Sequence, residues 1–168
     1  NVLAYDPFIN AKTMMDGRVK MHQDFTALLP HVDILTFHVP LNDQTGNMLC
    51  AKTLEHCRHG VMVINASRGG VVNESDLLVA LDSGLCGGLA VDVFATEPPP
   101  ADHPMRDHPR VLVTPHLGAS TQEAQEAVSI AAAKSLLAFL RDEGLSGAVN
   151  IAGFRVDLDP IQCGFVDL

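Results

Sequence analysis

The run Val61-Met-Val-Ile-Asn-Ala-Ser-Arg-Gly-Gly70 decides the fold. Its first four residues are apolar and mostly β-branched, which predicts a parallel strand covered on both faces. A turn follows, and Asn73 is placed to cap a helix over 74–83, with Asp76 as its capping-box partner. Ligands of an open α/β sheet bind outside the carboxyl ends of the strands, which is where Arg68 falls. A fixed cation there suits a carboxylate ligand, and a surface ion pair is the alternative.

Strands and helices are expected to alternate along the rest of the chain. Further strands are predicted over 1–7, 33–40, 87–94 and 111–115. Residues 11–20 suit a short helix and a connecting segment, and Asp24 can cap another short helix. Ser120 with Glu123 forms a capping-box pattern that opens a long helix to about Asp142. This alternation predicts an α/β fold, a Rossmann-like doubly wound parallel sheet with right-handed crossovers.

Polar residues gather where the predicted strands end: Asp6, His38, Arg68, Asp92, Glu97 and His116. Parallel strands bring such ends to one edge of the sheet. Oxidation of a 2-hydroxy acid requires a cation for the carboxylate, a group that exchanges a proton, and a cofactor that carries hydride. Arg68 suits the first task and His116 the second, with Glu97 orienting the imidazole. His38 is interpreted as a structural or cofactor-lining residue.

Composition narrows the class of protein. The chain has 168 residues, 47% hydrophobic and 18% charged, so it is expected to bury one ordered core. A formal charge of −9 argues against nucleic-acid and anionic-membrane partners. No signal-peptide or membrane-spanning pattern is visible, and we expect a cytoplasmic protein.

The histidines and cysteines outside the strand ends are expected to carry no chemistry. His103 and His108 fall in a polar, proline-containing loop over 101–109 and are expected to be solvated. The cysteines lack the paired spacing of a metal site, so we expect reduced structural thiols and neither a zinc ion nor any other metal; they are Cys50, Cys57, Cys86 and Cys163.

Three blocks resemble the signature motifs of the D-isomer-specific 2-hydroxyacid dehydrogenases. They are Asn65-Ala-Ser-Arg-Gly-Gly-Val-Val-Asn-Glu74, Asp92-Val-Phe-Ala-Thr-Glu-Pro98 and Pro115-His-Leu-Gly-Ala-Ser-Thr121. The last block, with Leu145-Ser-Gly-Ala-Val-Asn150, is most similar to the phosphoglycerate dehydrogenase group of this family. The resemblance extends to about residue 150.

The resemblance implies an NAD-dependent oxidoreductase of D-2-hydroxy acids, converting 3-phosphoglycerate to 3-phosphohydroxypyruvate in serine biosynthesis, whose parent enzyme is a homo-oligomer. By resemblance, Arg68 binds the substrate carboxylate and carbonyl oxygen, and Glu97 pairs with His116, the acid and base. Asp6 would hold the adenosine ribose, and its charge disfavours NADP. The implied cofactor contacts are Asp6, His38, Val39, Pro40, Ala66, Ser67, Arg68, Asp92, His116, Gly118 and Ala119.

The chain also departs from the family pattern. No G-x-G-x-x-G phosphate loop precedes Asp6, Val39 stands where the family has threonine, and the sequence from 151 onward no longer resembles the family. We therefore expect a partial NAD-binding Rossmann domain over 1–119 that lacks its first strand and phosphate loop. A long helix and return segment toward an absent substrate domain would follow over 120–150, and a divergent tail over 151–168. Such a fragment is expected to bind NAD weakly.

Two other functions fit the same residues. One is an NAD-sensing binding protein of the corepressor type, and the other is a fragment without turnover.

Overall fold

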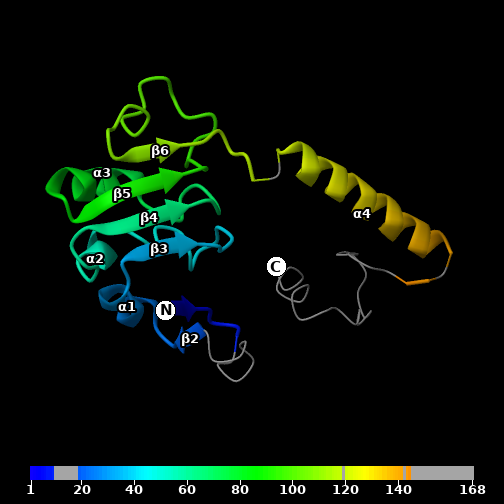
Figure 1. Ribbon diagram of the computed structural model, residues 1–168, viewed down its shortest axis with the longest axis horizontal. Coiled ribbons are helices and arrows are strands. Elements are labelled where there is room, and N and C mark those ends of the chain that lie inside the picture. The colour runs from blue at the N-terminus through cyan, green and yellow to red at the C-terminus, as the bar shows by residue number, and fades with distance from the viewer. Residues whose placement is uncertain (10–18, 119, 142, 145–168) are drawn as a thin grey trace. The chain divides into compact units, whose positions relative to one another are not determined.

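A computed structural model describes residues 1–9, 19–118, 120–141 and 143–144, and the chain divides into two units, Asn1–Leu117 and Gly118–Leu168. The first unit contains two parallel sheets with helices (Figure 1). The Rossmann-like α/β fold that the sequence predicted is confirmed. The predicted tail over 151–168, the block over 145–150, Ala119 and Cys163 lie outside the described residues.

All strands of the first unit run parallel to their neighbours. In the smaller sheet, β1 (Val2–Tyr5) pairs with β2 (Val19–His22). The larger sheet has the order β3 (Ile34–Phe37), β4 (Val61–Asn65), β5 (Cys86–Val91) and β6 (Val111–Val113). Because neighbouring strands are parallel, the turns that follow β3 to β6 all lie at one edge of this sheet.

An aromatic side chain joins the two sheets. Phe25 begins the short helix α1 (Phe25–Leu28), and its ring centroid lies 6.0 Å from that of Tyr5 and 6.2 Å from that of Phe37. Tyr5 ends β1 and Phe37 ends β3, so α1 packs against both sheets. A doubly wound sheet has the strand order 3-2-1-4-5-6. The pair β2-β1 corresponds to the 3-2 half of this order and β3-β4-β5 to its 4-5-6 half, with β6 as one further strand.

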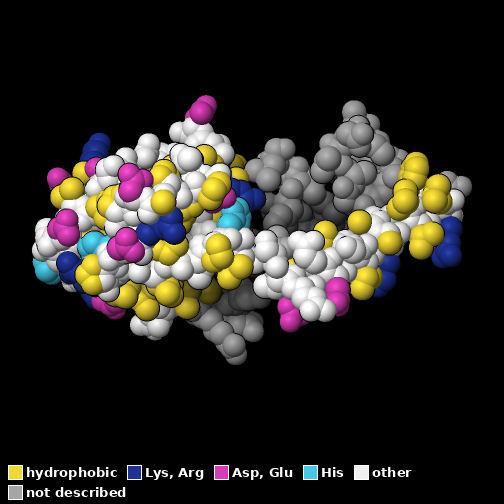
Figure 2. Space-filling model, turned by 90° about the horizontal axis from the view of Figure 1, so that it is seen from above, with side chains coloured by type: hydrophobic (Ala, Val, Ile, Leu, Met, Phe, Trp, Pro, Cys, Tyr) yellow, Lys and Arg dark blue, Asp and Glu magenta, His cyan; other side chains and the backbone are white. Residues whose placement is uncertain are grey.

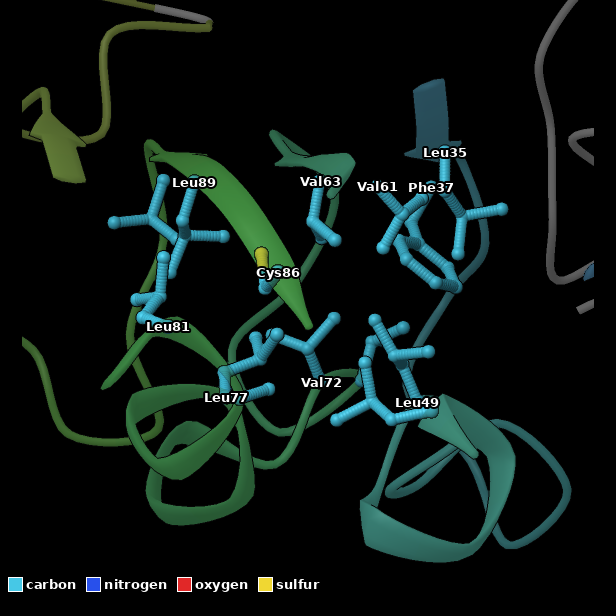
Figure 3. Packing of buried hydrophobic residues seen from close by; sticks show 14 of the residues in the cluster. Leu35, Phe37, Leu49, Val61, Val63, Val72, Leu77, Leu81, Cys86 and Leu89 are labelled. Atoms are coloured by element: carbon cyan, nitrogen blue, oxygen red, sulfur yellow. The ribbon is translucent and has the colours of Figure 1, made fainter. Parts of the chain in front are cut away.

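One face of the larger sheet carries the hydrophobic core. Buried side chains of β5 lie beside Leu77 and Leu81 of α3 (Glu74–Ser83), and those of β3 lie nearer Leu49 and α2, all in one cluster (Figure 3). The 3-10 helix Leu29–His31 and α2 (Ala51–Leu54) add Leu29 and Leu54. On the opposite face Met62 and Ile64 are exposed. Within the first unit the helices therefore cover β4 on one face, whereas the apolar run of β4 predicted that both faces are covered.

The predicted bounds of α3 are confirmed. Asn73 caps the helix, its side chain accepting a hydrogen bond from the backbone N–H of Asp76, and Gly84 ends it at a left-handed φ of 81°. The predicted capping box is wrong in its second half. The Asp76 carboxylate instead accepts the N–H of Ala51 at 2.7 Å, which ties the start of α2 to the start of α3.

Two other predictions differ from the structure. β2 occupies part of a segment for which a short helix and a connection were predicted, because Val19-Lys-Met-His22 alternates apolar and polar residues over too short a run to be recognised. The long helix α4 runs over Gln122–Leu140 and is capped by Thr121, whose side chain accepts the N–H of Ala124, so Ser120 is not the cap.

Helix α4 belongs to the second unit, and hydrophobic side chains lie along it (Figure 2). In the described part of the chain no helix combines the length and the apolar character needed to span a bilayer.

Candidate active site

Three turns at the carboxyl edge of the larger sheet carry the residues with predicted catalytic roles. Arg68 follows β4, Glu97 follows β5 and His116 follows β6, and these three strands are neighbours. Parallel pairing alone brings their ends to the same edge. The contacts within each turn then decide which side chains meet.

The turn after β4 is organised by a buried amide. Asn65 is fully buried; its Oδ1 accepts the Ser67 hydroxyl at 2.8 Å and the Ser67 N–H at 3.2 Å. Its Nδ2 donates to the carbonyl oxygen of Arg68 at 3.0 Å. The exposed Arg68 side chain bends back, and its Nη1 donates to the carbonyl oxygen of Ser67 at 2.8 Å. The backbone that presents the guanidinium is therefore held from inside the core.

The Glu97 carboxylate makes one contact with each of its oxygens. Oε1 accepts the backbone N–H of Phe94 at 2.9 Å, and Oε2 lies 2.6 Å from Nδ1 of His116. The hydrogen bond from His116, followed by that from the Phe94 N–H, holds the pKa of Glu97 below its usual value. Glu97 is therefore a carboxylate at neutral pH, fixed both to its own turn and to the imidazole.

His116 has an unusual backbone, with a φ of 55° in the left-handed region. Asp92 holds the turn in which it lies, since Asp92 Oδ1 accepts the Thr114 hydroxyl at 2.5 Å and the Leu117 N–H at 2.9 Å. These two bonds flank His116 on either side. Residues other than glycine adopt such a φ mostly where the surrounding structure imposes it, often in functional sites.

The turn that carries Arg68 packs against the turn that carries Glu97. A Cβ atom on Gly69 would lie 1.8 Å from the carbonyl oxygen of Phe94, so the turn after β4 lies directly on the turn after β5. Glu97 and His116 are in direct contact, while the Arg68 guanidinium donates to the Ser67 carbonyl within its own turn. The contact at Gly69 therefore joins the turn that carries Arg68 to the turn that carries Glu97.

The predicted cofactor contacts lie in several turns. Asp6 follows β1, where its Oδ1 accepts the N–H of Phe8 at 2.8 Å, and His38 follows β3, where its Nε2 lies 3.0 Å from the Thr36 hydroxyl. A carboxylate can accept more hydrogen bonds than the one from the Phe8 N–H, so Asp6 can also accept those of a ribose diol. Polar residues at the ends of parallel strands fit a dinucleotide, which binds at that edge of the sheet. The other predicted contacts among the described residues are Val39, Pro40, Ala66, Ser67, Arg68, Asp92, His116 and Gly118.

Two histidines were predicted incorrectly. His103 and His108 were expected to be solvated, yet their side chains are only 16% and 12% exposed. His103 Nε2 lies 3.2 Å from Glu74 Oε2, and His108 Nε2 lies 3.4 Å from Asp82 Oδ1. Both carboxylates belong to α3. No local pattern could have revealed these pairs, because the partners are 29 and 26 residues apart.

Comparison with known proteins agrees with this geometry. Residues 1–118 match the family described as D-isomer specific 2-hydroxyacid dehydrogenase, NAD binding domain. The D-3-phosphoglycerate dehydrogenase of Bacillus subtilis (strain 168) is 38% identical over 156 residues, which are 93% of this chain and 29% of that protein. The enzyme of the same name from Homo sapiens is 40% identical over 158 residues, 94% of this chain and 29% of that protein.

The chain spans less than a third of the length of these two relatives. Among solved structures, the NAD-dependent formate dehydrogenase of Staphylococcus aureus in complex with NAD has a TM-score of 0.71 at 31% identity, covering 85% of this chain and 42% of that one. The family model therefore identifies the family, and the solved structure shares the fold. The chain belongs to the NAD-binding domain family of the D-isomer-specific 2-hydroxyacid dehydrogenases.

Proposed function

We propose that this chain carries the NAD-binding and catalytic part of an oxidoreductase that interconverts a D-2-hydroxy acid and its 2-oxo acid. The observation that supports the proposal most is the distance of 2.6 Å between His116 Nδ1 and Glu97 Oε2. The turn that carries Glu97 also packs against the turn that carries the exposed Arg68, and the chain belongs to a dehydrogenase family. D-3-phosphoglycerate is the proposed substrate, because the sequence relatives at about 40% identity bear that name.

Arg68 binds the substrate in this proposal. A guanidinium is permanently charged and has five N–H donors, so the bond from Nη1 to Ser67 leaves donors for a carboxylate and its neighbouring oxygen. Bidentate binding of the carboxylate would fix the adjacent carbon that bears the hydroxyl group. Fixing the reacting atoms in this way accelerates a reaction by making it effectively unimolecular.

His116 exchanges the proton. Its Nδ1 faces Glu97, so Nε2 is the ring atom that takes the proton of the substrate hydroxyl during oxidation and returns it to the carbonyl oxygen during reduction. Glu97 keeps the ring in one orientation and complements its positive charge after the proton arrives, as the carboxylate of a catalytic triad does. The bound cofactor NAD would supply the acceptor for the hydride that leaves the substrate carbon.

The residues proposed to hold NAD come from several strand ends. Asp6 would bind the adenosine ribose, and His38 with Val39 and Pro40 would line the site beyond β3. Ala66 to Arg68 and Asp92 would line the site at the neighbouring ends of β4 and β5. The proposal of NAD over NADP rests on the negative charge of Asp6, which repels a 2′-phosphate.

The test is formation of NADH from NAD and D-3-phosphoglycerate by the purified protein. D-lactate, D-glycerate and formate serve as competing substrates, and His116→Ala and Arg68→Ala as variants. We expect turnover with the phosphorylated substrate and a loss of about 100-fold to 10,000-fold in kcat for His116→Ala. Arg68→Ala should mainly raise KM for the acid.

Some outcomes would overturn the proposal. Turnover of formate in place of 2-hydroxy acids would contradict the substrate class, and an active His116→Ala variant would contradict the mechanism. NAD-dependent association with a partner in the absence of any turnover would favour the binding-protein alternative.

A further inference from the structure

Two adjacent backbone amides in the turn after β5 are each bound by a glutamate. The N–H of Phe94 donates to Glu97 Oε1 at 2.9 Å, and the N–H of Ala95 donates to Glu74 Oε1 at 2.7 Å. Glu97 belongs to the same turn, whereas Glu74 is the first residue of α3. The two peptide units that meet at Phe94 are therefore both fixed: the Val93–Phe94 unit is bound to Glu97 of the same turn, and the Phe94–Ala95 unit is bound to a ten-residue helix.

The second oxygen of each glutamate meets a histidine. Glu97 Oε2 contacts His116, and Glu74 Oε2 lies 3.2 Å from His103 Nε2. The side chains of Glu74 and His103 are 19% and 16% exposed, against 36% and 47% for Glu97 and His116. Burial strengthens a charge-assisted hydrogen bond because solvent screens it less. The pair with no proposed chemical role is thus the better shielded one.

His103 also packs on the turn that it helps to hold. Its ring lies edge-on to Phe94, with 5.2 Å between the ring centroids and 77° between the planes. Edge-to-face contacts of this kind stabilise a pair of rings beyond the area they bury. His103 therefore touches Glu74 through its Nε2 atom and Phe94 through its ring.

The same peptide also fixes the turn that presents Arg68. A Cβ atom placed on Gly69 would fall 1.8 Å from the carbonyl oxygen and 2.1 Å from the carbonyl carbon of Phe94, so the two turns are in backbone contact. A shift of the Phe94–Ala95 peptide would consequently move the turn that carries Arg68 by contact, and it would also move the adjoining Val93–Phe94 peptide, whose N–H binds Glu97.

We propose that Glu74 and His103 are positioning residues, which hold the Phe94–Ala95 peptide so that Glu97 meets His116 and the Arg68 turn keeps its place. The carboxylate of Glu74 lies in the first turn of α3, where the helix dipole favours a negative charge. The helix thereby gives the catalytic turns a rigid anchor. The effect of Glu74 and His103 on catalysis rests on the proposed function. Their effect on the contact between Glu97 and His116 can be measured without turnover.

The experiment follows the titration of the Glu97 carboxyl by ¹³C NMR in the purified protein. The contact with His116 and the Phe94 N–H holds the pKa of Glu97 below its usual value, so this pKa reports whether the two contacts persist. We expect Glu74→Ala to raise it toward the ordinary value for a glutamate, about 4.3. Glu74→Gln keeps an oxygen for the Ala95 N–H and should restore most of the shift.

The matched control is the other pair that joins α3 to this loop. Like Glu74, Asp82 is an α3 residue whose carboxylate meets a loop histidine, in this case His108. Asp82→Ala removes that contact, and neither Asp82 nor His108 has a hydrogen bond to the Phe94–Ala95 peptide. We expect this variant to leave the Glu97 titration unchanged. His103→Phe keeps a ring against Phe94 but loses the nitrogen, so it should shift the Glu97 titration part of the way and provides a second test if Glu74→Ala fails to fold.

The proposal is overturned if Glu74→Ala or His103→Phe folds and Glu97 titrates as in the parent chain, since the pair would then only stabilise the loop. In an active protein, Glu74→Ala should lower kcat by about 10-fold to 100-fold, with rescue by Glu74→Gln. Absence of turnover in the parent protein would contradict the proposed function alone, because the NMR result does not depend on it.

Discussion

Asn65 and Arg68 are joined across the turn after β4, where the fully buried amide of Asn65 donates to the carbonyl oxygen of Arg68 at 3.0 Å. The other end of the same amide accepts both the hydroxyl and the N–H of Ser67. A single core side chain thus satisfies three polar groups of a turn that has no regular structure. The catalytic role proposed for Arg68 depends on this turn.

The first prediction concerns this amide. Asn65→Ala removes both hydrogen-bonding ends of the side chain and leaves buried backbone groups without partners. We expect it to lower the free energy of unfolding by about 1 to 3 kcal/mol, measured by urea denaturation. Lys52→Ala at an exposed position of α2 is the control and should change it by less than about 0.5 kcal/mol. Equal effects of the two substitutions would contradict the role given to Asn65.

A second prediction compares two glycines. Gly69→Ala would place a methyl group 1.8 Å from the Phe94 carbonyl oxygen, so the turns after β4 and β5 must separate. Gly60 has a φ of +83° but nothing within 4 Å of a Cβ position, so Gly60→Ala costs only the left-handed backbone, about 1 to 2 kcal/mol. We expect Gly69→Ala to destabilise the chain more than Gly60→Ala in the same urea titration. The reverse order would show that the two turns are not in contact.

A third prediction is the pH dependence contributed by Glu97. Its pKa is lowered in the folded chain by His116 and by the Phe94 N–H, with desolvation and then the charge of Asp92 opposing, so folding favours the carboxylate. The stability it contributes is present above the unfolded pKa of about 4.3 and is lost as the pH falls through the lower folded value. Glu97→Gln removes this contribution.

The gap in unfolding free energy between parent and Glu97→Gln should therefore be larger near about pH 7 than near about pH 3. Urea titrations at the two pH values measure it. A gap that stays constant, or that widens in acid, would be incompatible with the contact between Glu97 and His116.

A fourth prediction concerns thiol reactivity. Burial, with a smaller effect of the neighbouring Cys86, raises the pKa of the Cys57 thiol to about 11, and burial also raises the pKa of Cys86. Only the thiolate reacts with iodoacetamide, so alkylation of Cys57 at about pH 8 should be on the order of 100-fold slower in the folded chain than in urea. Mass spectrometry of the two samples measures the rates; equal rates would contradict the burial of this thiol.

The sequence predicted the parts of the fold that local chemistry determines. Asn73 and Gly84 define the two ends of α3 because a side-chain cap and a left-handed glycine act within a few residues. The alternation of strands and helices likewise fixes parallel pairing, which brings the ends of β4, β5 and β6 to one edge. Motif resemblance then supplied the roles proposed for individual side chains.

Contacts between distant segments could not be predicted in this way. Glu74 looked like an ordinary first-turn helix residue and His103 like a solvated loop residue, because nothing local to either indicates a partner 29 residues away. Asp92 is predicted from the sequence only as a cofactor contact. In the structure it also accepts hydrogen bonds from the Thr114 hydroxyl and the Leu117 N–H, and these depend on the register of β5 beside β6. Such contacts depend on tertiary packing.

The break between the two sheets has a consequence for how the protein behaves in concentrated solution. In the part of the chain that the structure describes, β1 pairs with β2 alone and β3 with β4 alone, so each has one side on which backbone amides and carbonyls lack ladder partners. Such open edges recruit strands from other molecules. Self-association should therefore increase with concentration, and an extended peptide that inserts beside β1 or β3 should suppress it.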